Sequence, residues 1–370
     1  MKKILFIVDC LALGGLAKVI LTLSKELKAQ GHTIGLAILE NNIEYSEASN
    51  YWNRVNREPS PKNTLSKNRY RNRVAIFAEK SEKEFEDHFG KADLIIAAGE
   101  LAIRCAANLN HPNIVISSHS SQLQAKKLPG IIGELKFKIR IIRRSFRLRK
   151  LLNNKKLHFV SHGLMNEVTK TLKVTPHSAK VIYNPFNIEE IIEKSKEATT
   201  ESKNLPQKFI IGIGRFCKIK RFDRLIIAYK QAKIEADLIL IGQGDQEQNL
   251  KKLISDLDLQ EKVHLIPFHE NHYPILKNAS LLVLSSDSEG LSNVINEAFI
   301  LDVPVVSVDC PHGPKELLEG IQPNALVPPD APQELAQKIK FYYENPYPIP
   351  DWARKRVDIK TIVAQYLEMS

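Results

Sequence analysis

Cysteines are few in this sequence, and their spacing gives them no structural role. The four lie far apart and form no Cys-x-x-Cys pair: Cys10, Cys105, Cys217 and Cys310. This pattern argues against a disulfide framework or a cysteine-bound metal and predicts a reducing compartment. Long apolar runs are also missing, since no segment reaches the ~18 residues that a membrane span needs. The run Ile4–Val8 follows two lysines but is interrupted by Asp9, which favours a buried strand over a signal peptide.

Acidic residues are scarce in the first half of the chain. The 370 residues carry a formal net charge of +11, to which residues 1–185 contribute +16 and the remainder −5. An excess of one sign confined to one half predicts an anionic partner for that half. Hydrophobic residues make up 43% of the chain, enough for two domains of ordinary size.

The stretch 285–316 carries the clearest functional pattern. An apolar run ends in small polar residues and Glu289-Gly290, a helical pattern follows, and a β-branched run over 303–308 predicts a buried parallel strand. Ligands of such strand–helix–strand units bind at the carboxyl ends of the strands. Glu289 lies in the loop, and Glu297 follows two helical turns later, about 80° away around the axis. Both carboxylates are therefore predicted to address one ligand.

The start of the same helix adds a site for an anion. Ser292 or Asn293 is predicted to cap the helix, which leaves backbone N–H groups and the positive end of the helix dipole directed at the ligand. Hydroxyls would donate to the carboxylates and phosphate would accept from the backbone, and a nucleotide-sugar has both groups. The simpler alternative is that this is a capped surface helix whose two glutamates face solvent and bind no ligand.

The order and spacing of residues over this stretch resemble the E-x7-E signature of glycosyltransferase family 4. The matching residues are Glu289-Gly290-Leu291, Asn293-Val294, Glu297-Ala298, Pro304-Val305-Val306, Gly313 and Glu316. One position departs from the family, which commonly has glycine where this chain has Asp302. Asp tolerates turns and left-handed backbone, so activity is not expected to depend on this difference.

The resemblance implies an α/β protein with the GT-B fold, in which two Rossmann-like domains face each other across a cleft. Residues 1–186 are expected to form a basic acceptor-binding domain, 187–206 a linker, and 207–345 a nucleotide-sugar-binding domain. Residues 346–370 are expected to form a C-terminal helix that packs back on the first domain.

The resemblance also assigns roles in the second domain. Arg215 and Lys220 are expected to neutralise the diphosphate. Lys220 supplies a point charge, and Arg215 supplies a planar guanidinium that can bind two phosphate oxygens. Glu297 is expected to hold the ribose, and Phe268 either lies beside the base or belongs to the core. The remaining donor contacts are expected from Gly242, Glu289, Gly290, Leu291 and Ser292. Glu289 and, in the first domain, His119 are the catalytic candidates.

In the first domain, the resemblance places a glycine turn and a histidine near the donor. The turn is Gly14-Gly15, which lacks the full dinucleotide fingerprint and by itself indicates only a tight turn. His119 follows a buried strand, and it either donates to the sugar 6-position or shields the charge that builds during transfer. The polar stretch 41–73 is predicted to be a mobile loop, either an acceptor-recognition loop or a solvated insertion.

The run 134–156 predicts a basic amphipathic helix. One face carries cations, and apolar residues such as Leu135, Ile139, Ile142 and Phe146 occupy the rest. Such a helix either lies on anionic lipid or buries its apolar face in the domain core. The membrane interpretation assigns lipid contact to Lys136, Arg140, Arg143, Arg144, Arg147 and Lys150.

The sequence thus predicts a retaining hexosyltransferase with a UDP-hexose or UDP-N-acetylhexosamine donor and a lipid-linked or lipopolysaccharide acceptor. No DxD-type acid pair stands where a metal would chelate the phosphates, so neither a metal nor another cofactor is expected. The enzyme would be cytoplasmic and peripheral to the inner face of the plasma membrane. The alternatives are a GT-B synthase or phosphorylase with a soluble acceptor and, in a different class, a basic nucleic-acid-binding protein.

Overall fold

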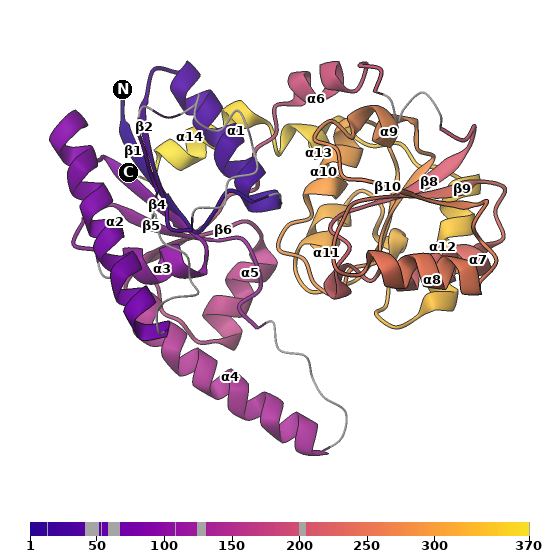
Figure 1. Cartoon of the computed structure of the whole chain (residues 1–370), viewed down its shortest axis with the longest axis horizontal. Helices are drawn as coiled ribbons and strands as arrows, with labels where there is room; N and C mark the ends of the chain where they lie inside the picture. Colours follow the sequence, from indigo (N-terminus) through magenta and orange to yellow (C-terminus); the bar gives the residue numbers. More distant parts are fainter. Residues whose placement is uncertain are drawn as a thin grey trace. The chain divides into compact units, whose positions relative to one another are not determined.

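The computed structural model describes residues 1–12, 14–40, 52, 54–57, 67–107, 109–123, 131–199 and 205–369. The chain divides into two compact units (Figure 1). Unit 1 contains Met1–Pro185 and Ile359–Ser370, and unit 2 contains Phe186–Asp358. Both are built from parallel strands joined by helices, so the predicted α/β class is confirmed.

Unit 1 is organised on a seven-stranded parallel sheet in the order β3-β2-β1-β4-β5-β6-β7. Its strands are β1 (Lys3–Val8), β2 (Thr33–Ile38), β3 (Arg54–Arg57), β4 (Leu94–Ala98), β5 (Ile114–Ser118), β6 (Lys156–Phe159) and β7 (Ser178–Val181). Its helices are α1 (Gly15–Ala29), α2 (Lys67–Phe89), α3 (Glu100–Ala106), α4 (Ile131–Leu152), α5 (His162–Asn166) with the π-helical turn Glu167–Thr171, and α14 (Ile359–Leu367). The central strands are apolar on both faces, because helices cover both.

Unit 2 repeats this plan with six parallel strands in the order β10-β9-β8-β11-β12-β13. The strands are β8 (Phe209–Ile213), β9 (Asp237–Ile241), β10 (Val263–Ile266), β11 (Leu281–Leu284), β12 (Val305–Val308) and β13 (Leu326–Val327). The helices are α6 (Ile188–Lys194), α7 (Phe222–Ala232), α8 (Glu247–Asp256), α9 (Tyr273–Asn278), α10 (Asn293–Ile300), α11 (Gly313–Leu318), α12 (Pro332–Glu344) and α13 (Asp351–Lys355), with 3₁₀ turns at Lys218–Lys220 and Pro323–Ala325.

Numbered from its first strand, the unit 2 sheet has the order 3-2-1-4-5-6 of dinucleotide-binding folds, and the unit 1 sheet has the same order with a seventh strand at its end. The chain runs outward from the first strand in one direction and then in the other. The order therefore reverses between β1 and β4 in unit 1 and between β8 and β11 in unit 2. Loops after these strands part at the reversal and leave a crevice for ligands at the carboxyl edge.

Three stretches fold differently from the sequence expectation. The expected linker 187–206 contains α6, which belongs to unit 2 and is capped by the Asn187 side chain. The expected loop 41–73 contains β3 and the start of α2, while its remainder lies outside the described residues. The single C-terminal helix is split, because α13 ends at Lys355 in unit 2 and α14 begins at Ile359 in unit 1. In unit 1, α14 packs beside α1 (Figure 1).

Asp302, in the turn before β12, has φ 62°, a left-handed conformation that Asp tolerates. Its carboxylate forms an ion pair with Arg354, whose Nη2 lies 2.9 Å from Asp302 Oδ1. Among the described residues, no helix combines the length and the apolar character needed to cross a bilayer.

Candidate functional site

Two loops meet at the reversal point of unit 2, one after β8 and one after β11. Lys220 lies on the first loop and Glu289 on the second, 69 residues further along the chain. Lys220 Nζ donates to Glu289 Oε1 at 2.7 Å, with 24% of the lysine and 10% of the glutamate side chain exposed. Ser286 Oγ donates to the same oxygen at 2.6 Å. The structure thus brings together two of the residues predicted to touch the diphosphate and the sugar.

Backbone and buried side chains fix the two loops to each other. Ser285 Oγ donates to the Lys220 carbonyl at 2.9 Å, and the Asp287 N–H donates to the Ile219 carbonyl at 2.8 Å. The buried Arg224 at the start of α7 donates to the Ser285 carbonyl at 2.8 Å and to Asp287 at 2.7 Å. These contacts fix the backbone of Lys220, whose ammonium is held by Glu289.

Arg215 lies on the same loop as Lys220, two residues after β8. Its side chain is exposed and forms no ion pair with any residue that the structure describes. The Phe216 N–H donates to the Gln243 carbonyl, so this loop packs on the turn after β9. A Cβ at Gly242 would lie 2.0 Å from the Gly214 carbonyl oxygen, and only glycine permits that approach. Gly242 thus supports the position of the Arg215 loop.

The segment Gly290–Ser292 leads into α10, and it packs tightly against the start of α11. A Cβ at Gly313 would lie 2.8 Å from Leu291 Cα. Ser292 is the N-cap residue of α10, as predicted, but its hydroxyl makes no cap hydrogen bond and is buried without a partner among the described residues. His312 precedes Gly313 with φ 80° and ψ −114°, a strained conformation for a residue with a Cβ.

Glu297 is buried on α10, with only 2% of its side chain exposed. His272, at the N-cap of α9, shares a hydrogen bond between its Nε2 and Glu297 Oε2 at 2.9 Å. The ring of Phe268 lies 6.3 Å from that of His272, between centroids. Phe268, His272 and Glu297 therefore form a second cluster in unit 2, in which an imidazole orients the carboxylate.

The unit 1 candidates lie after β1 and β5. Gly14 precedes α1, where a Cβ would come no nearer than 4.0 Å to the Ala12 carbonyl oxygen, and Gly15 is the first residue of the helix. His119 follows β5, and its Nε2 shares a hydrogen bond with Ser117 Oγ at 2.8 Å. Desolvation, with a smaller contribution from the nearby His158, lowers the pKa of His119 to about 3. Its imidazole is therefore neutral at physiological pH.

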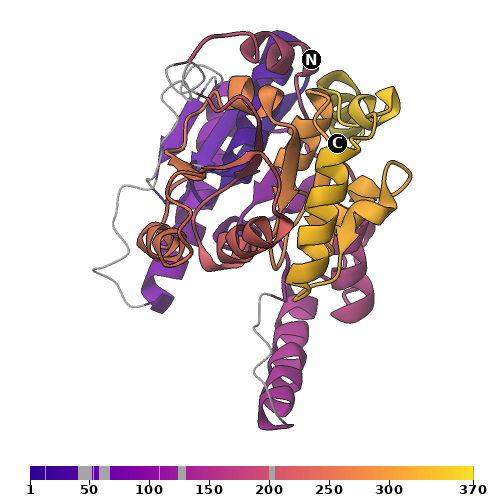
Figure 2. The same cartoon turned by 90° about the vertical axis from the view of Figure 1, so that its right-hand side faces the viewer.

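The helix α4 contains all six predicted membrane residues, and its amino-terminal half extends away from the unit 1 sheet (Figure 2). Ser145, Leu148 and Leu152 are buried against unit 1. Five of the six cations are exposed: Lys136, Arg140, Arg143, Arg147 and Lys150. Arg144 differs, since it is half-buried and donates to Gln122 Oε1 at 3.3 Å, toward the body of unit 1. It is therefore better placed to anchor the helix than to meet lipid.

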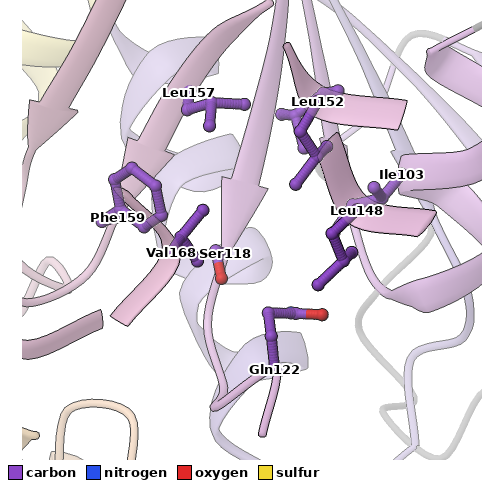
Figure 3. Close-up of a pocket in the computed structure, with 9 residues that line it drawn as sticks. Ile103, Ser118, Gln122, Leu148, Leu152, Leu157, Phe159 and Val168 are labelled. Carbon is purple, nitrogen blue, oxygen red and sulfur yellow. The ribbon is translucent and has the colours of Figure 1, made fainter. Parts of the chain in front are cut away.

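A small cavity lies between α4 and the strands β5 and β6 of the unit 1 sheet (Figure 3). Its walls are mainly apolar: Ile103, Ile116, Leu148, Leu152, Leu157, Phe159 and Val168, with Ser118 and Gln122 at one side. Its volume of about 20 Å³ leaves room for roughly one water molecule and none for a sugar. In the described part of the chain, no three His, Cys, Asp or Glu side chains gather as metal ligands.

Sequence reasoning missed the polar residues that support the candidates. Ser286 stands three residues before Glu289, and its alignment with that carboxylate follows from the loop geometry. His272 has only a weak signal, its position shortly after the end of β10. Ser117 and His158 each lie among apolar neighbours in β5 (IVISS) and β6 (KLHF), and a polar residue inside a buried strand is itself a signal.

Two family patterns together match most of the sequence. Residues 13–190 match the pattern described as Glycosyltransferase Family 4, and residues 181–360 match that of Glycosyl transferases group 1. A relative in Campylobacter jejuni is the N-acetylgalactosamine-N,N'-diacetylbacillosaminyl-diphospho-undecaprenol 4-alpha-N-acetylgalactosaminyltransferase. It is 30% identical over 185 residues, which are 50% of each chain. The chain spans about half the length of the curated relatives it matches, or less.

Solved structures resemble the chain over nearly its full length. A glycosyltransferase from Rickettsia africae has a TM-score of 0.73 at 17% identity, covering 100% of this chain and 97% of its own. HepE from Anabaena, in complex with UDP and glucose, has a TM-score of 0.74 at 20% identity, covering 100% and 99%. These likenesses confirm the predicted GT-B fold.

Proposed function

The chain belongs to the glycosyltransferases, with a family 4 domain followed by a group 1 domain, and on that basis we propose that it transfers a hexose or N-acetylhexosamine from a UDP-sugar. The acceptor we propose is a lipid-linked or surface-glycan hydroxyl, and the anomeric configuration is retained. The relative from Campylobacter acts on an undecaprenol-linked acceptor by its name, and the Anabaena structure holds UDP and glucose by its title.

The observation that carries the proposal is the contact between Lys220 and Glu289 at the reversal point of the unit 2 sheet. A cation and a carboxylate held by two different loops suit a ligand that has phosphate at one end and hydroxyls at the other. Lys220 and the exposed Arg215 would neutralise the diphosphate as it leaves, the electrostatic contribution that usually dominates such catalysis. Glu289 would accept from sugar hydroxyls, with Ser286 fixing one of its oxygens.

We propose that neighbouring residues bind the remaining parts of the donor. The backbone N–H groups of Gly290, Leu291 and Ser292 would donate to the sugar and phosphate at the start of α10. Glu297 would hold the ribose, oriented by its hydrogen bond with His272. Phe268 would lie beside the base, and Gly14 and Gly15 would let the unit 1 backbone approach the donor closely.

We propose a front-face transfer that needs no protein base. The bond between the anomeric carbon and the diphosphate oxygen breaks, with its electron pair leaving on the UDP. The acceptor oxygen forms a bond to the same face of that carbon, and its proton passes to the departing phosphate oxygen. We propose that Lys220 and Arg215 do the charge neutralisation that a divalent metal performs in other transferases.

We propose that α4 brings the enzyme to an anionic membrane, where a lipid-linked acceptor would be found. Four large apolar side chains lie exposed along one stripe of the helix, namely Leu135 (59%), Ile139 (41%), Ile142 (64%) and Phe146 (70%). Lys138 flanks the stripe on one side, and the five exposed cations described above flank it on the other. At roughly 1 kcal/mol per basic residue near anionic lipid, these charges would hold the protein there reversibly.

The exposed apolar stripe favours a membrane over a nucleic acid as the partner of α4, because a membrane would remove these side chains from water and a nucleic acid would not. The association would be peripheral, on the inner face of the plasma membrane. A test is co-sedimentation with phosphatidylglycerol vesicles. We expect Ile142→Ser combined with Phe146→Ser, or Arg140→Ser with Arg143→Ser and Arg147→Ser, to reduce binding by about 10-fold or more.

The matched control is Ile76→Ser on α2, because Ile76 is as exposed as Ile142, at 64%. Equal loss in this control, or full binding by both α4 variants, would contradict the membrane role. Binding of wild-type protein to neutral phosphatidylcholine as strong as to phosphatidylglycerol would contradict the role of the cations.

The donor is tested by thermal shift with UDP, GDP and ADP and with their sugar conjugates. We expect UDP-sugars to raise the midpoint of unfolding most, because a ligand that binds only the folded state stabilises it by mass action. Arg215→Ala and Lys220→Ala should each reduce this shift. The donor assignment is contradicted if no nucleotide raises the midpoint or if the two variants respond like wild type.

A further inference from the structure

Three buried polar side chains lie behind the half-buried His119 in unit 1. Ser117 lies in β5 and His119 directly follows that strand, and the two side chains are in hydrogen-bonding contact. His158 pairs with Ser117 across the neighbouring strands β5 and β6. Tyr366 comes from α14, and its ring centroid lies 5.0 Å from that of His158. Ser117, His158 and Tyr366 are almost completely buried, so the proton positions among them are not averaged by bulk water.

The donor and the acceptor of each hydrogen bond in this cluster can be assigned in turn, starting from the contact between His158 and the Ile182 carbonyl. His158 Nε2 lies 2.9 Å from the Ile182 carbonyl oxygen, and a carbonyl can only accept, so Nε2 carries a proton. In a neutral imidazole the other nitrogen is then an acceptor. Ser117 Oγ lies 2.6 Å from His158 Nδ1. The single hydroxyl proton of Ser117 must therefore point at His158.

The next contact follows from the first. Ser117 Oγ also lies 2.8 Å from His119 Nε2. Its only proton is already used, so it can meet His119 only as an acceptor, and His119 Nε2 must carry the proton. The reverse arrangement would leave two lone pairs facing each other at 2.6 Å unless His158 were doubly protonated.

Burial makes a doubly protonated His158 unfavourable. Desolvation lowers its pKa to about 4, against a smaller opposing effect from the hydrogen bond with the Ile182 carbonyl. The phenol of Tyr366 stays protonated, because burial raises its pKa above the ordinary value. The cluster is thus a chain of neutral groups in which the protons shared by Ser117, His158 and His119 each have one favourable position.

We infer that Ser117 and His158 are positioning residues that hold His119 as the Nε2–H tautomer, leaving Nδ1 as a bare acceptor. No described residue supplies a partner for Nδ1. A neutral imidazole with a free lone pair accepts a hydrogen bond from a hydroxyl, and it cannot donate through Nδ1 or neutralise a growing negative charge. Of the two roles that the sequence left open for His119, donation to a sugar oxygen and charge shielding, neither fits this tautomer.

The ligand class that fits is a sugar hydroxyl, of the donor or of the acceptor, that donates its proton to Nδ1. This assignment of the ligand rests on the proposed function, whereas the tautomer rests only on the cluster. The cluster also makes α14 part of the arrangement, because Tyr366 packs against His158. A residue at the very end of the chain thereby supports a side chain after β5.

Nitrogen NMR of the full chain labelled with ¹⁵N-histidine tests the tautomer directly. Two-bond correlations distinguish a protonated from a bare ring nitrogen, and the His119→Gln spectrum identifies the signals. We expect His119 to show Nε2–H and bare Nδ1 from pH 7.5 to pH 5.5. A proton on Nδ1, or titration of His119 near the ordinary histidine pKa, would overturn the inference.

Ser117→Ala removes the acceptor for His119 Nε2, and we expect the two His119 tautomers to become mixed in this variant. Ser118→Ala is the matched control, since Ser118 is the next residue on β5 but points to the opposite face. Unchanged His119 signals in Ser117→Ala would contradict the positioning role. If Ser117→Ala does not fold, the wild-type spectrum alone decides the tautomer.

Adding ligand separates the inference from the proposed function. We expect the UDP-sugar with the largest thermal shift to move the His119 Nδ1 signal, while UDP alone leaves it in place. If the tautomer is as inferred but neither that UDP-sugar nor a lipid-linked acceptor moves Nδ1, the hydroxyl contact is wrong and the positioning chain stands. If the tautomer differs, the positioning chain is wrong whatever the ligands do.

Discussion

Replacing Lys220 by alanine tests the diphosphate site most sharply, because two effects act in the same direction. The variant loses the ammonium that would meet the phosphates. It also leaves Glu289, with 10% of its side chain exposed, without the cation that lies 2.7 Å from Oε1. The freed carboxylate would then repel the incoming diphosphate.

The expected magnitude follows from the contact. A hydrogen bond to a charged group contributes about 1.5–3 kcal/mol, which corresponds to a loss of roughly 10- to 150-fold in affinity for UDP. Isothermal titration calorimetry with UDP measures this loss. Lys218→Ala is the matched control, since Lys218 lies on the same 3₁₀ turn but is exposed.

A double-mutant cycle separates the two effects. In a Glu289→Gln background, Lys220→Ala no longer exposes a carboxylate, so the loss of UDP affinity should shrink by about 0.5–3 kcal/mol. The reasoning is refuted if Lys220→Ala binds UDP as tightly as Lys218→Ala, or if the loss is the same with and without the carboxylate.

Three further predictions concern turnover, metal and pH. Glu289→Gln should lower turnover on the order of 100-fold or more, while the exposed Glu319→Gln should not; near-normal turnover of the first would remove Glu289 from the site. EDTA should leave transfer activity unchanged, and a loss that Mg²⁺ or Mn²⁺ restores would show that the reaction uses a metal. The pKa values of His119 and His158 in the folded state are about 3 and about 4, below the ordinary value of 6.5. As the pH falls through about 6.5, these two histidines therefore take up protons in the unfolded state but not in the folded state. Their contribution to the free energy of unfolding should therefore fall by about 3 kcal/mol between pH 7.5 and pH 5.5; urea titrations of wild type and of His119→Gln should differ in this dependence, and identical curves would contradict the buried neutral pair.

The unit 2 site was largely predictable from the sequence, for a physical reason. Parallel strands buried on both faces are short apolar runs, and polar residues directly after them fall at one edge of the sheet. Glu289 and Lys220 both follow such runs, and they meet in the structure. Asp302 was predictable in the same way, because the left-handed turn before β12 accepts few residue types.

Other features depend on contacts that one strand or helix does not reveal. The stretch 187–206 is charged and looked like a linker, yet α6 packs in unit 2 and has an Asn187 cap. A helical wheel places Arg144 on the same face as the other cations. In the structure, Arg144 instead donates a hydrogen bond to Gln122, in the loop after β5 of unit 1. Ser292 occupies the N-cap position without making the cap bond, and its hydroxyl is buried with no partner among the described residues.

The support around His119 was the least predictable part. His158 and Tyr366 are 208 residues apart, and only the packing of α14 on the unit 1 sheet brings their rings together. Ser117 and His158 become neighbours through the register of β5 and β6, which the sequence alone does not specify. Long-range polar contacts of this kind leave no periodic pattern in the chain.

A crystal structure of the chain bound to UDP would test the central claim most directly. We expect the diphosphate at the carboxyl edge of the unit 2 sheet, within hydrogen-bonding distance of Lys220 Nζ and the Arg215 guanidinium. UDP bound elsewhere, with the Lys220–Glu289 contact facing no ligand, would contradict it.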